Sequence, residues 1–177
     1  AIVQHDEAAM AAYFDGNEPD LATLKKILRK AVIANDIFPV FAGSALKNKG
    51  VQLVLDAVID YLPSPLDLPP VEGTDPRTGE QVAYKRGKDE PFAGIAFKIQ
   101  IDPHVGKLTY VRIYSGKLVA GSYAYNSTKD VKERVGRLLL MHANQREEIK
   151  EAFAGEIVAV VGFKDTITGD TICDPDK

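Results

Sequence analysis

The stretch Phe38–Gly50, FPVFAGSALKNKG, decides how the first part of this chain is interpreted. A short apolar run from Phe38 to Ala42 ends at Gly43, and an amphipathic helix is expected to begin near Gly50. A strand, a tight loop and a helix start in this order are typical of the place where α/β folds hold a nucleotide against backbone N–H groups. The same residues also fit an ordinary tight turn, because Gly and Ser are frequent in turns.

Composition indicates a globular chain of one large or two small domains. The chain has 177 residues, of which 45% are apolar and 27% charged, with a net charge of -3. A single cysteine, Cys173, excludes an internal disulfide and fits a reducing compartment. No apolar run approaches the roughly 20 residues that span a bilayer, and the first residues form no signal peptide. We therefore expect a cytoplasmic protein.

The region before residue 66 is predicted to be mainly helical. Asp6–Asp15 is a short helix candidate, and Asp20 is placed to cap a second helix that runs to about Asn35. A stripe of apolar residues at helical spacing marks the second helix: Leu21, Leu24, Leu28, Ala31 and Val32. Its basic residues predict a solvated face: Lys25, Lys26, Arg29 and Lys30. The helix after Gly50 is apolar around much of its circumference, which predicts burial on more than one side.

A proline-rich segment separates this region from the rest. Residues 62–70 contain four prolines, which cannot continue a helix and favour an extended, semi-rigid chain. We place the domain boundary here, with residues 1–66 in the first domain and 67–177 in the second. The N-terminus lacks methionine and starts inside an apparent helix, so we expect a piece of a longer protein.

After the boundary the hydrophobic period changes to two. Ile95, Phe97, Ile99 and Ile101 alternate with smaller or polar residues, which predicts a half-buried strand. The turn Asp102–Gly106 follows, and further strands are expected at Leu108–Tyr114, Ser122–Tyr125, Glu133–Met141, Glu156–Val161 and Asp170–Cys173. Turn residues between them include Asn144 and Gly155. Short strands at this spacing, with no helices between them, predict a small closed β-barrel.

The search for catalytic chemistry yields no candidate. The three histidines, His5, His104 and His142, lie in different elements without a metal-ligand partner at helical spacing. Cys173 has no nearby activating base and is interpreted as a small buried side chain. Glu147, Glu148 and Glu151 lie in a run of mixed charge that favours an exposed turn or short helix. The residues Asn48 to Val51 begin like the guanine-reading NKxD motif, but Val51 replaces its aspartate.

Several motifs, taken in order, resemble one family over essentially the whole chain. Residues 41–51 and 55–65 resemble the end of the GTPase domain of bacterial translation elongation factor G. The second half resembles the second domain of that family at Gly136–Leu139, Met141–Asn144, Arg146–Ile149, Ala154–Ile157 and Thr168–Asp174. The resemblance implies the C-terminal α/β segment of a P-loop GTPase domain, followed by an all-β barrel of the translation-factor type.

The resemblance also implies a function, which is GTP hydrolysis during ribosomal translocation in the intact parent. Gly43, Ser44, Ala45 and Leu46 match the last guanine-contacting motif, whose backbone would donate to the base. GTP or GDP with Mg²⁺ is expected in the parent, and no cofactor is expected on this chain alone. The phosphate-binding elements would precede Ala1, and further domains would follow Lys177. We therefore expect no catalytic residue in this chain and no activity from it alone.

The expected partner is the ribosome, through small-subunit RNA and protein, with no role for DNA or membranes. From Lys98 to Arg137 there are eight Lys/Arg and three Asp/Glu, a local balance of +5. Basic residues displace counterions from phosphates, so five of them are candidate RNA contacts: Lys117, Lys129, Lys132, Arg134 and Arg137. The alternative is a solvated barrel surface, since charged side chains are mostly exposed.

Three other functions remain open. The chain could be a ribosome-binding barrel in its own right, or it could come from a related translational GTPase of the ribosomal protection or release type. His104, Phe153 and Phe163 depart from the commonest family pattern, so the alternatives within the family stay open. A stand-alone enzyme is disfavoured because no nucleophile, metal or acid–base group is placed for it.

Overall fold

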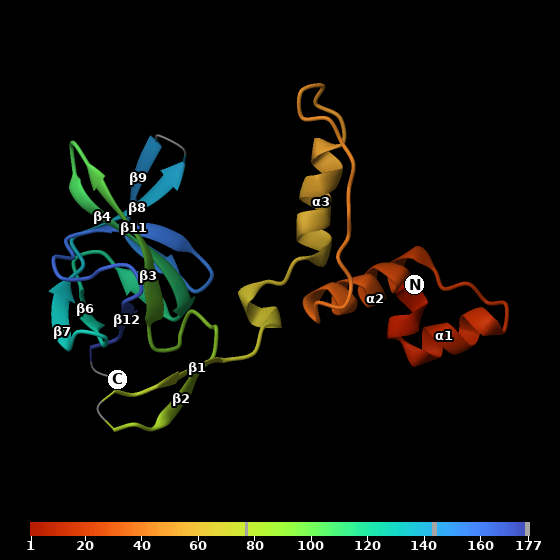
Figure 1. Cartoon of the computed structure of the whole chain (residues 1–177), viewed down its shortest axis with the longest axis horizontal. Coiled ribbons are helices and arrows are strands. Elements are labelled where there is room, and N and C mark those ends of the chain that lie inside the picture. The colour runs from red at the N-terminus through yellow and green to blue at the C-terminus, as the bar shows by residue number, and fades with distance from the viewer. Residues whose placement is uncertain (77, 143–144, 176–177) are drawn as a thin grey trace. The chain divides into compact units, whose positions relative to one another are not determined.

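The computed structural model describes residues 1–76, 78–142 and 145–175. The chain divides into two compact units, Ala1–Pro63 and Ser64–Lys177. The first unit is helical and the second is almost entirely β (Figure 1). Each unit is described below by itself.

The helical unit contains η1 (Ile2–His5), α1 (Glu7–Phe14), α2 (Leu21–Ile33) and α3 (Val51–Tyr61). The predicted cap is confirmed, because the carboxylate of Asp20 accepts from the Thr23 amide at 2.8 Å. Asp6 caps α1 in the same way and accepts from the Ala9 amide at 2.9 Å. These bonds satisfy amides that have no partner within the first turn of a helix.

The predicted strand at residues 38–42 is wrong, and with it the α/β character of the first unit is not evident. These residues have no regular secondary structure, and the nearest pairing is a single bridge between Ser44 and Lys49. A strand needs a neighbour to take its N–H and C=O groups, and no other strand occurs in the described residues 1–63.

The prediction that the helix after Gly50 is buried on several sides is also wrong. In α3 only Ala57 is buried, and Leu53, Leu55 and Ile59 are 68%, 59% and 77% exposed. The stripe predicted on α2 is largely confirmed: Ala31 is buried, three other members are partly buried and only Leu21 is exposed, while the buried Ile27 lies outside the predicted stripe.

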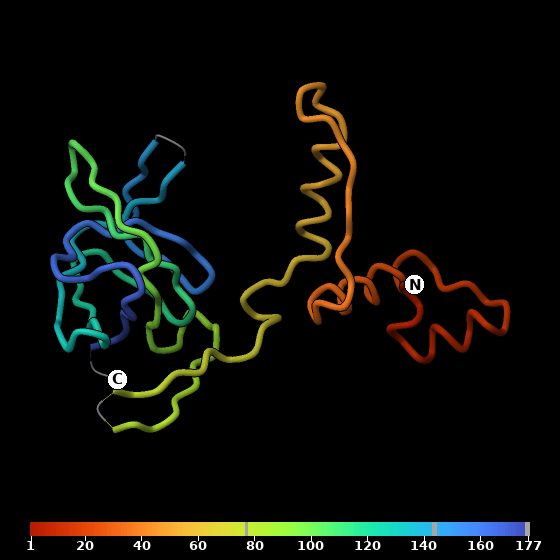
Figure 2. The backbone as a smooth tube through the Cα atoms, viewed as in Figure 1, coloured from red at the N-terminus to blue at the C-terminus, as the bar shows by residue number. Residues whose placement is uncertain are grey.

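In its described residues, the second unit contains η2 (Pro65–Asp67) and twelve strands. The first four are β1 (Val71–Thr74), β2 (Gln81–Tyr84), β3 (Ala93–Asp102) and β4 (Gly106–Ser115). The others are β5 (Lys117–Val119), β6 (Tyr123–Asn126), β7 (Val131–Arg134), β8 (Arg137–His142), β9 (Gln145–Ile149), β10 (Glu151–Phe153), β11 (Ile157–Val161) and β12 (Thr171–Cys173). Their hairpins can be followed along the backbone in Figure 2.

Eight strands form one antiparallel sheet in the order β7-β6-β12-β3-β4-β11-β8-β9. Two smaller pairs, β10 with β5 and β1 with β2, complete the unit. Side chains from strands far apart in this order, including Ala124 of β6 and Leu138 of β8, enter one core cluster. The sheet is therefore rolled around its core, as the predicted barrel requires.

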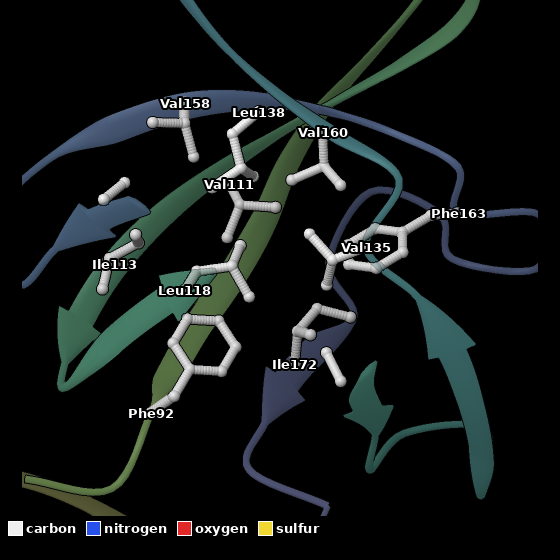
Figure 3. Close-up of a cluster of buried hydrophobic side chains, with 12 residues drawn as sticks. Phe92, Val111, Ile113, Leu118, Val135, Leu138, Val158, Val160, Phe163 and Ile172 are labelled. Carbon is white, nitrogen blue, oxygen red and sulfur yellow. The ribbon is translucent and has the colours of Figure 1, made fainter. Parts of the chain in front are cut away.

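Figure 3 shows this core, to which Val111, Ile113, Leu118, Leu138 and Val160 contribute side chains that are at most 2% exposed. Burying such side chains contributes about 1.5–3 kcal/mol each relative to exposure.

The strand β3 is confirmed, but its buried face is that of Gly94 and Ala96. The large residues Ile95 and Phe97 lie on the outer face and are 38% and 42% exposed. Close packing explains why small residues lie on the buried face of β3, because a Cβ on Gly94 would lie 2.9 Å from the Arg112 carbonyl oxygen. The register with β4 also shifts between Ala96 and Lys98, as in a β-bulge.

Two other strand predictions need correction. The single strand expected at Glu133–Met141 is two strands, β7 and β8, separated at Gly136, where a Cβ would lie 2.6 Å from the Val161 carbonyl oxygen. The turn or short helix expected at residues 145–151 is the strand β9 and the start of β10. The predicted turn residue Asn144 lies outside the described residues.

Candidate functional site

The predicted guanine-contacting residues Gly43 to Leu46 form a closed backbone loop at the start of α3. The Ser44 amide donates to the Lys49 carbonyl at 2.9 Å, and the Lys49 amide donates back to the Ser44 carbonyl at 3.0 Å. Gly50 follows in the left-handed region, with φ 76°, and its carbonyl accepts the first bond of α3 from Val54. The loop is thus fixed by its own backbone.

Gly43 has a structural reason to be glycine. A Cβ at this position would lie 2.8 Å from the Lys49 carbonyl oxygen, which real Cβ atoms essentially never do. The small residue therefore allows the two sides of the loop to approach, whether or not a ligand is bound.

Two amides of the loop remain open to a partner. Among the residues that the structure describes, no acceptor is found for the Ala45 and Leu46 amides, and the Leu46 side chain is 96% exposed. The Lys47 amide, by contrast, donates to Ser44 Oγ at 3.4 Å. Exposed amides beside a helix start can donate to an oxygen of a ligand.

The five candidate RNA contacts do not form one cluster. Lys117 Nζ lies 3.7 Å from Glu151 across the β5–β10 pair, and Arg137 lies 3.9 Å from Glu148 of β9. Lys129 lies 3.6 Å from the buried carboxylate of Asp170. These three cations already have acidic neighbours within the chain.

Lys132 and Arg134 differ from those three. Both are exposed on the same face of β7, an edge strand of the large sheet. Among the described residues, no acidic side chain forms an ion pair with either of them. Lys132 Nζ lies 5.2 Å from the centroid of the Tyr123 ring, and Tyr123 is the cross-strand neighbour of Arg134. This part of β7 therefore presents cations beside an exposed aromatic ring.

A buried polar network, which the sequence reasoning missed, fixes the loop before β12. The carboxylate of Glu133 accepts from the amides of Asp165 at 2.8 Å and Thr166 at 3.0 Å, and also from Lys164. Lys107 Nζ donates to two carbonyls of the same loop, those of Lys164 and Thr166. The alternation of Val131, Glu133 and Val135 was the available signal, because it places the glutamate on the inward face.

The electrostatics of this network favour the charged carboxylates. Burial raises the pKa of Glu133, but hydrogen bonds from Thr166, Asp165 and Lys164 outweigh it and hold the pKa below its usual value. For Asp170, burial likewise raises the pKa, and the Ile167 amide, Asn126 and the Lys129 charge together lower it. Both groups act as acceptors for amides, so the network is interpreted as structural.

Other reactive side chains lie apart. His5 is 3.8 Å from Asp36, and His142 is 3.9 Å from Glu147 on the exposed β8–β9 hairpin. Within the described part of the chain, no group of three or more His, Cys, Asp or Glu residues is placed to hold a metal ion. The described helices are also all too short or too polar to cross a bilayer.

Comparison with known proteins adds a family-model match for the second unit and a fold for the whole chain. Residues 91–175 match the family model described as elongation factor G domain 2. The whole chain is also similar to a crystal structure of a protein from Thermus thermophilus, with a TM-score of 0.72 and 27% sequence identity. This similarity covers 99% of the chain but only 24% of the Thermus protein, so the chain spans about a quarter of that relative. Together these findings show that residues 91–175 are similar to the second domain of elongation factor G, and that the chain as a whole shares its fold with about a quarter of the Thermus protein.

Proposed function

We propose that the chain is part of a bacterial elongation factor G that hydrolyses GTP while the ribosome translocates. The observation that carries this proposal is the match of residues 91–175 to the second domain of that factor. In the proposal, residues 1–66 are the C-terminal part of the GTP-binding domain and residues 67–177 are the barrel that docks on the ribosome.

The proposed nucleotide contact is the loop Gly43-Ser44-Ala45-Leu46. The exposed Ala45 and Leu46 amides suit a carbonyl on the edge of guanine, and the backbone bonds between Ser44 and Lys49 hold the loop in shape. GTP or GDP, with Mg²⁺, would be bound by the intact parent. Because this loop offers only two donors, we expect no measurable GDP affinity from the chain alone. Micromolar binding of GDP in a titration calorimeter would contradict this part of the proposal.

The proposed ribosome contact is the β7 edge of the barrel. Lys132 and Arg134 are exposed and are not paired with acidic side chains in the described residues, whereas Lys117, Lys129 and Arg137 lie near carboxylates. A cation that already lies beside a carboxylate of the chain gains less binding free energy when it contacts a phosphate. We therefore place the larger share of the RNA contact on Lys132 and Arg134.

The test is co-sedimentation of the chain with bacterial small ribosomal subunits at increasing salt. We expect weak binding that falls with salt, because phosphate contacts release counterions. Lys132→Gln with Arg134→Gln should lower the slope of log K against log salt by about 1.5, since each phosphate contact contributes about 0.7–0.9. Lys150→Gln, an exposed cation at the end of β9, is the matched control. Binding that does not change with salt concentration would contradict the proposed contact between β7 and RNA phosphates.

A further inference from the structure

A pocket lies between the β1–β2 hairpin and the outer face of the large sheet. Its volume is about 430 Å³, within the size range of small-molecule sites. Tyr84 and Val82 of the hairpin form one wall, and Tyr114, Tyr125, Ile95 and Cys173 of the sheet form the other.

The segment that follows the hairpin is tied to the barrel at two positions. Ser115 Oγ donates to the Lys85 carbonyl at 2.7 Å, and the Gly116 amide donates to the Gly87 carbonyl at 2.9 Å. A Cβ on Gly116 would lie 2.4 Å from the Glu90 carbonyl oxygen, so the chain crosses here at close range. The pocket therefore has a fixed base.

Three tyrosines from three different strands line the pocket, together with the hydroxyl residues Ser127 and Thr171. Aromatic rings with a few hydroxyls suit a flat heteroaromatic ligand, which stacks on a ring and accepts or donates hydrogen bonds at its edge. The described lining contains Glu72 and Asp75 but no cation, which disfavours an anionic group inside the pocket.

Cations lie just outside the pocket instead. The guanidinium of Arg112 lies 5.1 Å from the centroid of the Tyr114 ring, and that of Arg86 lies 5.6 Å from the same centroid. Farther along β4, the centroid of the Tyr110 ring lies 5.3 Å from Nζ of Lys98 on the neighbouring strand β3. Stacking rings interleaved with cations are the combination by which proteins hold single-stranded nucleic acid, with bases on the rings and phosphates on the cations.

We infer that this pocket takes one unstacked nucleobase of single-stranded RNA, while the adjoining phosphates contact Arg112 and Arg86. The inference deepens the proposed function and rests on it for the choice of RNA. A peptide partner fits the floor less well, because β12 and β3, which form the floor, are each paired on both sides and offer no open edge to an added β-strand.

Cys173 makes the inference directly measurable, because it is the only thiol in the chain and lies in the pocket wall. The whole chain is alkylated with iodoacetamide, and the rate is followed by mass spectrometry with and without an oligoadenylate of about ten nucleotides. We expect the RNA to slow alkylation several-fold, while an abasic oligonucleotide of equal length does not. Equal protection by the abasic chain, no protection by saturating RNA, or protection only by a tyrosine-containing peptide would overturn the inference.

Variants at Tyr114 provide the second test, read as affinity for fluorescent oligoadenylate. Tyr114→Ala should weaken binding about fivefold to a hundredfold, the usual loss when one stacking ring is removed. Tyr114→Phe should retain affinity, because stacking needs the ring and not the hydroxyl. Comparing the alanine and phenylalanine variants separates the loss of stacking from a folding defect. Tyr13→Ala, an exposed tyrosine of the helical unit, is the matched control. Weak binding by Tyr114→Phe, or unchanged binding by a folded Tyr114→Ala, would contradict the inference.

The two proposals fail differently. If small subunits bind in a salt-sensitive way but RNA does not protect Cys173, the nucleobase pocket is wrong and the ribosome contact stands. If RNA protects Cys173 but small subunits do not bind, the pocket stands and the proposed docking function is wrong.

Discussion

The barrel buries its large apolar side chains, whereas the helical unit leaves most of its own in contact with solvent. In the described residues of the barrel, one cluster joins twelve buried apolar residues. In residues 1–63 the buried apolar residues are Ala9, Ile27, Ala31 and Ala57, three of which are alanine. The comparison indicates that burial of apolar side chains is the main source of stability in the barrel. In residues 1–63, helix caps and a few polar contacts between helices contribute a larger share of the stability.

Truncating one leucine in each region is the most direct test of this difference in packing, and it should give the largest effect. Leu138→Ala should lower the free energy of unfolding of the barrel by about 2–5 kcal/mol, because Leu138 is fully buried and leaves a cavity. Leu55→Ala, at an exposed position of α3, should change stability by no more than about 0.5 kcal/mol. Hydrogen exchange read peptide by peptide separates the two regions. Equal losses would show that α3 has packing partners that its exposure does not reveal.

The buried carboxylate of Glu133 tests whether polar contacts also matter more in the barrel. Glu133→Gln should lower barrel stability by about 1.5–3 kcal/mol, because it replaces a charged acceptor of several amides with a neutral group. Glu147→Gln on the exposed strand β9 is the matched control and should be nearly neutral. Urea unfolding followed by circular dichroism measures both. A neutral Glu133→Gln would mean that the loop before β12 is held by Lys107 instead.

Acid should weaken the barrel through the same network. Glu133 and Asp170 have pKa values below their usual range in the folded chain, so the unfolded chain binds more protons as the pH falls. Their stabilisation is fully present above the ordinary carboxyl pKa of about 4 and is lost as the pH falls further. Unfolding measured from neutral pH downwards should show this loss, and Glu133→Gln should reduce its slope. An unchanged slope would exclude Glu133 as a source of acid sensitivity.

In the helical unit, removing a helix cap should speed amide exchange more than truncating an apolar side chain of α3 does. Asp20→Ala removes the acceptor of the Thr23 amide and should speed amide exchange in α2 about fivefold. Asp20→Asn keeps a capping oxygen and should restore most of the protection. If the alanine and asparagine variants exchange alike, the cap is not what holds the start of α2.

The sequence predicts elements that carry their own local signals. Asp6, Asp20 and Gly50 mark the three helix starts, and alternation marks β3. The strand β9 was missed because it is an edge strand with both faces largely exposed, so it has no apolar alternation. The predicted strand at residues 38–42 has the right composition, but composition cannot supply a neighbouring strand.

The site shows the same limit. The closed loop at Gly43 follows from local residues and was expected. The ion-pair partners of the cations do not follow from local sequence. Lys129 and Asp170 are 41 positions apart in the sequence, and they come close only when β12 is paired in the sheet. The pocket beside Tyr114 was missed for the same reason, since its walls come from segments separated in the chain.

The smallest expected effect concerns the ion pair between α2 and α3. Lys25 Nζ donates to Asp60 at 2.6 Å, and this hydrogen bond raises the pKa of Lys25, but both side chains are well exposed to solvent. Exposed pairs gain little because water and salt screen them. Lys25→Ala, Asp60→Ala and their double variant should therefore show a coupling of less than about twofold in α3 amide exchange. Arg29 is a different case, since it donates to the Ile59 and Asp60 carbonyls at 3.2 and 2.9 Å. If the Lys25–Asp60 coupling exceeds the loss in Arg29→Ala, charge rather than backbone hydrogen bonding joins the two helices.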